Sequence, residues 1–311
     1  MRNIKYLLSF VLMLFFFTNS SWSQQETTIS NYWSHMNIIN PAYVGSDNMV
    51  NWRSTLRNQW SGIADAPETQ MFSFSSPLGK NVGMGMSIVN DKVFVESNSY
   101  IAFDFSYKLK VSEKANLFFG LKAGAQFYSV NAANLETFNI IGDPSLGNID
   151  NSYPNVGLGF LLKKEKWYLS LSAPRILNTE RVSIEREIAT MATDKPHLYI
   201  SSGYKFDLNS EWSLTPSFLV SSVEDVPLLF DFNLLTAYSD IIDLGITYRN
   251  SKTYAAILSF KVSDNFKVGY AYETSSRTLL SNEWNTSEIF LGYSIPFKNR
   301  RGQVISEDII D

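Results

Sequence analysis

Apolar and polar residues alternate along much of the chain, and the clearest case is LFFGLKAGAQFY at residues 117–128. Every second residue from Leu117 to Phe127 is apolar, whereas Gly120, Lys122 and Gly124 fall between them. This alternation predicts a β-strand with one apolar face and one polar face. It runs well beyond the five or six residues that are usual for a strand in a soluble sheet. The length of the strand therefore raises the question of what covers each face.

The same period predicts fourteen strands, and their connections fall into two classes. The predicted strands are 49–60, 69–77, 82–91, 98–109, 115–129, 154–163, 166–173, 197–207, 211–222, 227–238, 241–249, 254–262, 266–274 and 287–297. Even-numbered strands are followed by tight polar turns, such as PLGKN after the second strand and KVSEK after the fourth. The long connections, 130–153, 174–196 and 275–286, follow odd-numbered strands. Short periplasmic turns and longer extracellular loops are typical of outer-membrane barrels.

The predicted strands carry apolar residues on one face and charged residues or glycines on the other. The charged residues of the second face are Arg53, Arg57, Asp104, Lys108, Lys122, Lys205, Asp243, Lys267, Glu273 and Glu288. Because hydrocarbon cannot hydrate an open sheet edge, such a sheet must close on itself. We therefore predict an all-β fold, a transmembrane outer-membrane β-barrel of about 14 antiparallel strands, with its apolar face against outer-membrane lipid and its charged face lining the lumen. Pro216 lacks an N–H donor and predicts a bulge or an unpaired position in the ninth strand.

The amino terminus has the pattern of a secretory signal peptide, which we assign to residues 1–23. Arg2 and Lys5 precede an apolar run at 7–17, and small residues stand before a cleavage site at Gln24. The run is too short for a comfortable transmembrane helix, although an amino-terminal anchor is the alternative. Residues 24–48 are then a periplasmic or lumenal segment, 49–297 the barrel, and 298–311 a polar periplasmic tail.

Composition and the scarcity of reactive residues argue against several functions. The chain has no cysteine, which excludes a disulfide framework and a cysteine metal site, and its net charge of −4 is scattered, so we expect no nucleic-acid partner. Of the two histidines, His35 precedes the barrel and His197 shares a strand face with Ser201, roughly 13 Å away. Asp143, Asp150 and Asp194 lie in long connections without the spacing of a calcium loop. We therefore predict no enzyme and assign no catalytic, cofactor or metal residues.

Two arginines of the first strand are the leading candidates for a lumenal contact. Arg53 and Arg57 are four residues apart, so both face the lumen, roughly 13 Å from each other. They are either a surface for a partner segment or plug, or members of an ion-pair ladder that packs the interior. In a closed barrel the last strand pairs with the first in antiparallel orientation, which brings Glu288 beside Arg57 or Arg53. Reduced solvation in the lumen favours that pairing.

Motifs in the first part of the chain point to a family. They are NIINPAY at 37–43 followed by Gly45, RNQWSG at 57–62, APETQ at 66–70 and SPLGKNVGMGMSIVND at 76–91. Together they resemble the PorP/SprF family of outer-membrane proteins in the type IX secretion and gliding apparatus of Bacteroidetes. The motif residues singled out are Asn40, Pro41, Ala42, Tyr43, Gly45, Arg57, Gln59, Trp60 and Gly62.

The resemblance implies a location and a set of partners. It implies the outer membrane of a Bacteroidetes-like Gram-negative cell, and export or surface attachment of a secreted adhesin through that adhesin's C-terminal domain. It also implies coupling to the periplasmic ring lipoproteins of the type IX system. The alternative is a porin or a hydrophobic-solute channel, with 130–153 folded inward as a constriction loop. Mixed-sign charges on the lumenal face favour a packed interior over an open pore.

Overall fold

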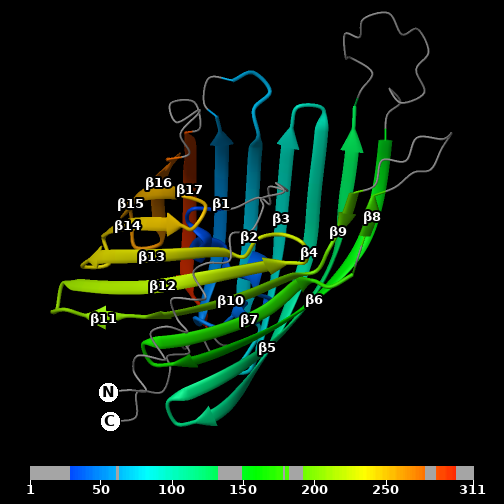
Figure 1. Cartoon of the computed structure of the whole chain (residues 1–311). Helices are drawn as coiled ribbons and strands as arrows, with labels where there is room; N and C mark the ends of the chain where they lie inside the picture. Colours follow the sequence, from blue (N-terminus) through cyan, green and yellow to red (C-terminus); the bar gives the residue numbers. More distant parts are fainter. Residues whose placement is uncertain are drawn as a thin grey trace, which may run out of the picture.

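The computed structural model describes residues 29–60, 63–131, 149–177, 179–181, 192–276 and 285–298. Strands dominate this part of the chain (Figure 1). They are β1 (Met49–Gln59), β2 (Glu68–Pro77), β3 (Val82–Val93), β4 (Glu96–Ser112), β5 (Ala115–Val130), β6 (Ile149–Lys164), β7 (Trp167–Arg175), β8 (Thr179–Arg181), β9 (Ala192–Asp194), β10 (His197–Tyr204), β11 (Phe206–Asp207), β12 (Trp212–Val223), β13 (Leu229–Tyr238), β14 (Ile242–Arg249), β15 (Thr253–Lys261), β16 (Phe266–Ser275) and β17 (Thr286–Pro296).

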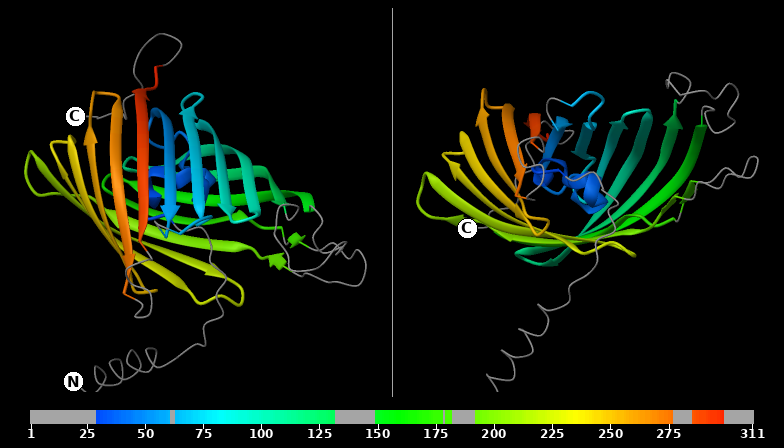
Figure 2. Two further views of the ribbon diagram at one scale, coloured as in Figure 1. Left: turned by 90° about the horizontal axis from the view of Figure 1, so that it is seen from above. Right: turned by 45° about the horizontal axis from the view of Figure 1, so that its top comes forward.

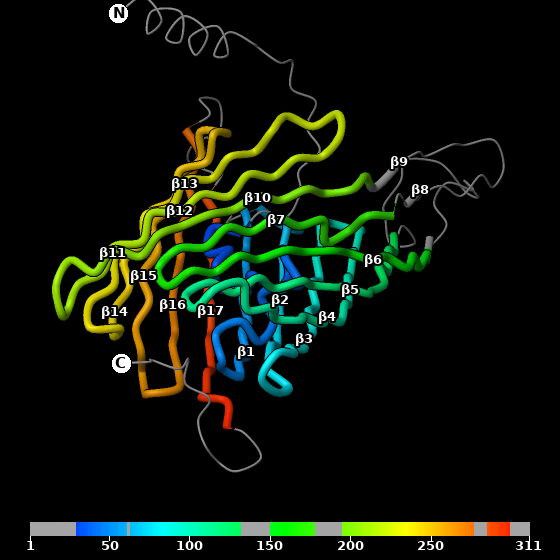
Figure 3. The backbone as a smooth tube through the Cα atoms, turned by 90° about the horizontal axis from the view of Figure 1, so that it is seen from below, coloured from blue at the N-terminus to red at the C-terminus, as the bar shows by residue number. Residues whose placement is uncertain are grey.

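The large sheet is antiparallel and closes on itself. Neighbours in sequence pair along the whole sheet, β1 pairs with β17, and β10 pairs with both β7 and β12. Figure 3 shows both closing contacts, and β8 and β9 form a separate hairpin. Because β10 and β11 are separated only by Lys205 and both pair with β12, the described residues form a barrel of fourteen strands. The predicted fold class is confirmed.

Most predicted strand ends agree with the structure within three residues, and β6 is the main exception. It begins at Ile149 rather than at 154, and residues 149–153 pair with 126–130 of β5. Their sequence, IDNSY, does not alternate. Alternation of apolar and polar residues is required only where one face of a strand meets lipid. A strand that continues beyond the lipid-facing part of the barrel therefore carries no periodic signal there.

The two ends of the barrel differ in their connections. At one end, which we call the short-connection end, the strands are joined by 78–81, 113–114, 165–166, 208–211, 239–241 and 262–265. The start of β1 and the end of β17 lie at this end as well. The opposite, long-connection end holds the connections that contain 131–148, 176–196 and 276–285. It also holds two tight connections, 94–95 and 250–252, so the lengths sort by end less strictly than the sequence suggested.

Polarity is inverted relative to a soluble protein. Outward-facing Phe103 and Leu121 are 61% and 56% exposed, whereas Asp104 and Lys122 on the opposite face are buried. An apolar exterior around a polar interior is the pattern of a barrel in lipid. Among the described residues, none of the helices has the length and apolar character needed to cross a membrane.

Pro216 of β12, the ninth strand of the barrel, lies opposite the break between β10 and β11. Pairing of β12 with β10 ends at Ser217–Gly203, and pairing with β11 resumes at Leu214–Phe206. On its other side Pro216 keeps its register with Leu234 of β13. The missing N–H therefore removes pairing on one side only, and the predicted unpaired position is confirmed.

Residues 29–48, which we call the lumenal segment, lie inside the ring of strands (Figure 2). The segment contains three short helical turns, η1 (Tyr32–His35), α2 (Met36–Ile39) and η2 (Pro41–Tyr43). Tyr32, Ala42 and Val44 are almost completely buried. The sequence left two locations open for this part of the chain, the periplasm and the lumen, and residues 29–48 lie in the lumen. Residues 1–28 and 299–311 lie outside the described part of the chain.

Candidate functional site

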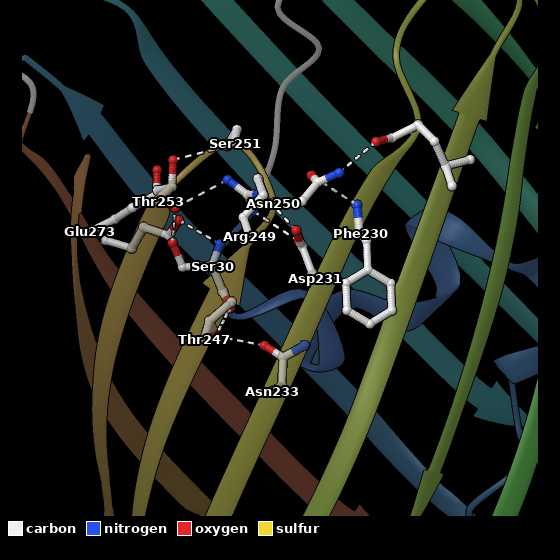
Figure 4. A network of polar contacts seen from close by, with 12 residues as sticks. Ser30, Phe230, Asp231, Asn233, Thr247, Arg249, Asn250, Ser251, Thr253 and Glu273 are labelled. Atoms are coloured by element: carbon white, nitrogen blue, oxygen red, sulfur yellow. Dashed lines mark hydrogen bonds and ion pairs between the residues drawn. The ribbon is translucent and has the colours of Figure 1, made fainter. Parts of the chain in front are cut away.

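A cluster of buried charges connects the pair β1 and β17, which we call the closing seam, to neighbouring strands. Arg57 and Glu288 are register partners across β1 and β17, and their side chains form an ion pair. Arg57 Nη2 also lies 3.0 Å from Glu273 Oε1 on β16. Arg249 on β14 joins the same cluster, 3.4 Å from Glu273 and 2.7 Å from Asp231 on β13. Figure 4 shows Arg249 between these two carboxylates.

The charged cluster also holds the start of the lumenal segment at Ser30. The backbone N–H of Ser30 donates to Glu288 Oε1 at 2.9 Å, and its hydroxyl donates to Glu273 Oε2 at 2.6 Å. Thr247 Oγ1 donates to the Ser30 carbonyl at 3.4 Å (Figure 4). The carboxylates thus receive N–H and O–H donors in addition to the arginines, which is the condition under which buried charges are tolerated. Seam and segment share one network.

A second buried ion pair holds the middle of the segment. Lys122 Nζ lies 2.7 Å from Asp104 Oδ1, and neither side chain is accessible to solvent. The same ammonium group donates to the backbone carbonyl of Asn37 at 3.0 Å. Farther along, Ser172 Oγ donates to the Ile39 carbonyl at 2.9 Å. Side chains of the barrel wall therefore form hydrogen bonds with the backbone of the segment as well as with its side chains.

Asn40 connects the lumenal segment to β6 and β7. Its Oδ1 accepts from the N–H of Ala42 at 2.8 Å and so caps η2. Its Nδ2 donates to the Phe160 carbonyl at 3.0 Å and to Ser170 Oγ at 2.8 Å. An asparagine amide offers both a donor and an acceptor, so one side chain satisfies the turn and the wall together.

His35 is buried between two strands. Its Nδ1 lies 2.8 Å from Ser73 Oγ on β2, and its Nε2 lies 2.8 Å from Thr55 Oγ1 on β1. Burial, and to a smaller extent the positive charge of Arg53, lowers the pKa of His35 to about 3. The imidazole is therefore neutral at physiological pH and bridges the two strands through hydroxyl groups.

Glycines on the lumenal face make room for the segment. A Cβ at Gly159 would lie 1.9 Å from Asn40 Oδ1, and one at Gly120 would lie 2.2 Å from the Ala42 nitrogen. Gly45 of the segment has φ +70°, which favours glycine, at the point where the segment passes Gly83. The alternation predicted glycines on this face, and the close contacts with the lumenal segment explain them.

The two candidate arginines have different surroundings. Arg57 meets Glu288 as the closing register requires, but Arg53 does not: its Nη1 donates to Ser294 Oγ at 2.8 Å and its Nη2 to Asn51 Oδ1 at 3.1 Å. Period two put both arginines on one face, but the register of β1 with β17 brings only Arg57 level with the carboxylate. Arg53 instead lies nearer the short-connection end.

The remaining predicted residues are spread over the lumen and its rim. The motif residues Asn40, Pro41, Ala42, Tyr43 and Gly45 belong to the lumenal segment, while Gln59 ends β1 and Trp60 follows it. Gly62 and Asp143 lie outside the described residues. His197 Nδ1 lies 3.3 Å from Arg175. Within the described residues no three potential ligands gather as a metal site.

Sequence reasoning missed Ser30, Arg249 and Asp231. Arg249 and Asp231 are register partners on β14 and β13, so a search for opposite charges at paired lumenal positions would have found them. Ser30 gave no comparable signal, because it precedes the barrel and has no periodic context.

Comparison with known proteins identifies the family. The profile of the family described as "Type IX secretion system membrane protein PorP/SprF" matches residues 21–293. The chain belongs to the PorP/SprF family. A sequence search of curated proteins gives no match. The expected family membership is thus confirmed, and it makes this barrel a membrane protein of a type IX secretion family.

Solved structures with similar folds are outer-membrane barrels. The Ralstonia pickettii toluene transporter TbuX is 9% identical, with a TM-score of 0.50 over 84% of this chain and 93% of that one. The Acinetobacter baumannii outer membrane protein Omp33 is 7% identical, with a TM-score of 0.47 over 79% and 97%. A Pseudomonas aeruginosa FadL homologue is 12% identical, with a TM-score of 0.45 over 88% and 99%. At such identities the likeness to TbuX shows the fold of an outer-membrane barrel and nothing finer.

Proposed function

We propose that this PorP/SprF barrel is a non-enzymatic scaffold of the type IX secretion system. In this role it assists export or cell-surface attachment of a partner adhesin and couples that adhesin to the secretion and gliding machinery. Family membership supports the assignment of the barrel to the type IX secretion system. The contacts of the lumenal segment support a docking role over a transport role.

The observation that carries this choice is the attachment of the lumenal segment along its length. The wall holds Ser30 near the long-connection end, Asn37 and Asn40 in the middle, and Ser46 through a 2.9 Å hydrogen bond from Lys163 Nζ to the Ser46 carbonyl. A segment fixed at successive heights occupies space that a conducting pore needs. Partners of a filled barrel meet its two ends rather than its interior.

The two ends offer different surfaces for the proposed partners. We assign the C-terminal domain of the secreted adhesin to the long-connection end, which we place outside the cell. The periplasmic ring lipoproteins belong at the short-connection end. That end presents exposed ion pairs between turns, Lys114 with Glu165 at 2.9 Å and Lys166 with Asp207 at 2.7 Å. Such mixed charge suits a polar protein contact.

A channel for small solutes is the second candidate, and one observation favours it. A cavity of about 500 Å³ lies between Trp33 of the lumenal segment and the wall made by β12 to β17. Charged residues of both signs line it, among them Lys267 and Asp243, which form an ion pair at 2.5 Å. A polar cavity of this size admits water and small solutes.

Deletion of the gene separates the two candidates. If the barrel serves an adhesin, the deletion strain loses that adhesin from its surface while general solute uptake stays normal. Surface proteomics and nutrient uptake measure the two effects, and complementation with the wild-type gene is the control. An unchanged surface proteome together with lost uptake of a nutrient would favour the channel.

A further inference from the structure

A cavity of about 140 Å³ lies between the lumenal segment and the barrel wall. Tyr32 and Ile39 of the segment line one side, and Met71, Val89 and Leu219 of the wall line the other. Other lining residues end their strands at the long-connection end of the barrel, including Arg175 of β7 and Arg249 of β14. The cavity therefore belongs to the half of the lumen toward the long-connection end.

Its volume and lining limit what it can hold. An apolar protein cavity of about 150 Å³ accommodates benzene, so this one has room for a single six-membered ring. Most of the side chains around it are aliphatic or aromatic, which favours an occupant with an apolar ring, and the rest, including Asp91, Ser221 and Asp231, are polar. A chain of several sugar or peptide units exceeds the space.

Two polar atoms in the lining add a chemical requirement. Asn98 and Tyr100 lie two residues apart on β4, so both side chains face the lumen. Asn98 Oδ1 and the Tyr100 hydroxyl are buried and have no hydrogen-bond partner among the described residues. Tyr100 is only 9% exposed. A carbonyl oxygen accepts only, whereas a hydroxyl both donates and accepts, so a ring that carries its own O–H satisfies this pair.

We propose that this cavity is a binding site for a phenol-class ring, meaning a single apolar ring that carries a hydroxyl group. The ring is either a free aromatic compound or the tyrosine side chain of a polypeptide that enters from the long-connection end. This site goes beyond the proposed docking role, because binding of a free phenol requires neither an adhesin nor the secretion machinery.

The test uses the purified full-length mature barrel in detergent, with p-cresol as the probe in isothermal titration calorimetry. Saturable binding at one site per barrel is expected. Toluene, which has the same ring without the hydroxyl, is expected to bind about tenfold more weakly, as the loss of one hydrogen bond of about 1.4 kcal/mol implies. Binding of p-cresol that never saturates, or equal binding of toluene, would overturn the proposal.

Variants locate the site and protect the test against misfolding. Leu219→Trp fills the cavity and is expected to abolish p-cresol binding. Tyr100→Phe removes only the hydroxyl and is expected to erase the preference for p-cresol over toluene while toluene still binds. Tyr293→Phe, on the outward face of β17, is the matched control and should bind as the wild type does. If both lumenal variants keep heat-modifiable gel mobility and wild-type binding, the cavity is not the site.

The source of the ring is decided by a second probe. The tripeptide N-acetyl-Gly-Tyr-Gly-amide carries the same ring on a polypeptide backbone. Binding of this peptide within about tenfold of p-cresol, with the same loss in Leu219→Trp, assigns the site to a tyrosine side chain. Binding of p-cresol alone assigns it to a free aromatic compound. Saturable binding of neither probe refutes the site, and this result leaves the proposed adhesin role unaffected.

Discussion

Replacing Arg57 by alanine removes the charge that joins both carboxylates at the closing seam. The arginine is 2% exposed, and it contacts Glu288 and Glu273 together. In the variant, Glu288 keeps the hydrogen bond from the N–H of Ser30, and Glu273 keeps its ion pair with Arg249. Removal of one member of a buried ion pair typically costs 3–5 kcal/mol, because the remaining charge is desolvated without compensation. We therefore expect the free energy of unfolding to fall by about 3–5 kcal/mol.

A double-mutant cycle isolates the contribution of the pair. Arg57→Ala, Glu288→Ala and the double variant are unfolded in urea, with heat-modifiable gel mobility as the folding readout. Glu288→Ala removes one carboxylate of the cluster and leaves Arg57 beside Glu273, so it should cost less than Arg57→Ala. Residues in direct contact show interaction energies of about 0.5–3 kcal/mol in such cycles, and a buried pair belongs in the upper part of that range.

The control is a solvent-exposed ion pair between a lysine and a glutamate. Lys114 and Glu165 lie 2.9 Å apart in two turns, with their side chains 69% and 55% exposed. Solvent screens such a pair, so Lys114→Ala should leave stability within experimental error. Additive effects of Arg57→Ala and Glu288→Ala, within about 0.5 kcal/mol, would refute the role of the pair in closing the barrel.

Three further outcomes are expected. Gly159→Ala should cost about 1–3 kcal/mol in urea unfolding, because its Cβ would lie 1.9 Å from Asn40 Oδ1; unchanged stability would show that the segment is held elsewhere. The folded-state pKa of His35 is about 3, below its ordinary value of 6.5, so its contribution is present above pH 6.5 and is lost as the pH falls toward 3. Stability should therefore drop by about 1.4 kcal/mol between pH ~7.5 and pH ~5.5, and His35→Gln should remove that part of the pH dependence. In intact cells an impermeant thiol reagent should label Lys195→Cys and not Asn209→Cys; the opposite labelling would reverse the orientation.

The barrel was predictable because its physical constraint is periodic. A strand between lipid and lumen must alternate, so the run from Leu117 to Phe127 identifies β5 without help from its neighbours. The seam was predictable for a related reason. Once the first and last strands are known to be antiparallel neighbours, Glu288 must lie beside Arg57 or Arg53, and the register in the structure selects Arg57. The start of β6 at Ile149 was missed because its pairing with β5 extends into a stretch whose sequence does not alternate.

The lumenal segment was not predictable by the same means. Its contacts join residues far apart in sequence, such as Asn40 with Ser170 and Lys122 with Asn37, and no local period encodes them. One signal was nevertheless present. Glycine weakens the interior of a strand and often marks the close approach of another backbone, so lumen-facing positions such as Gly120, next to the backbone of Ala42, indicate an occupant of the lumen.

The way in which the segment is held argues that it is a structural part of the barrel. Lys122 and Ser172 donate to carbonyls of the segment, and Ser106 Oγ donates to the Val44 carbonyl at 2.6 Å. Without the segment these donors, and the carboxylates around Ser30, would lose partners inside a poorly hydrated lumen. Seating of the segment and closure of the seam therefore stabilise each other. A partner that docks at either end, as proposed above, would therefore meet a wall that the lumenal segment braces from within.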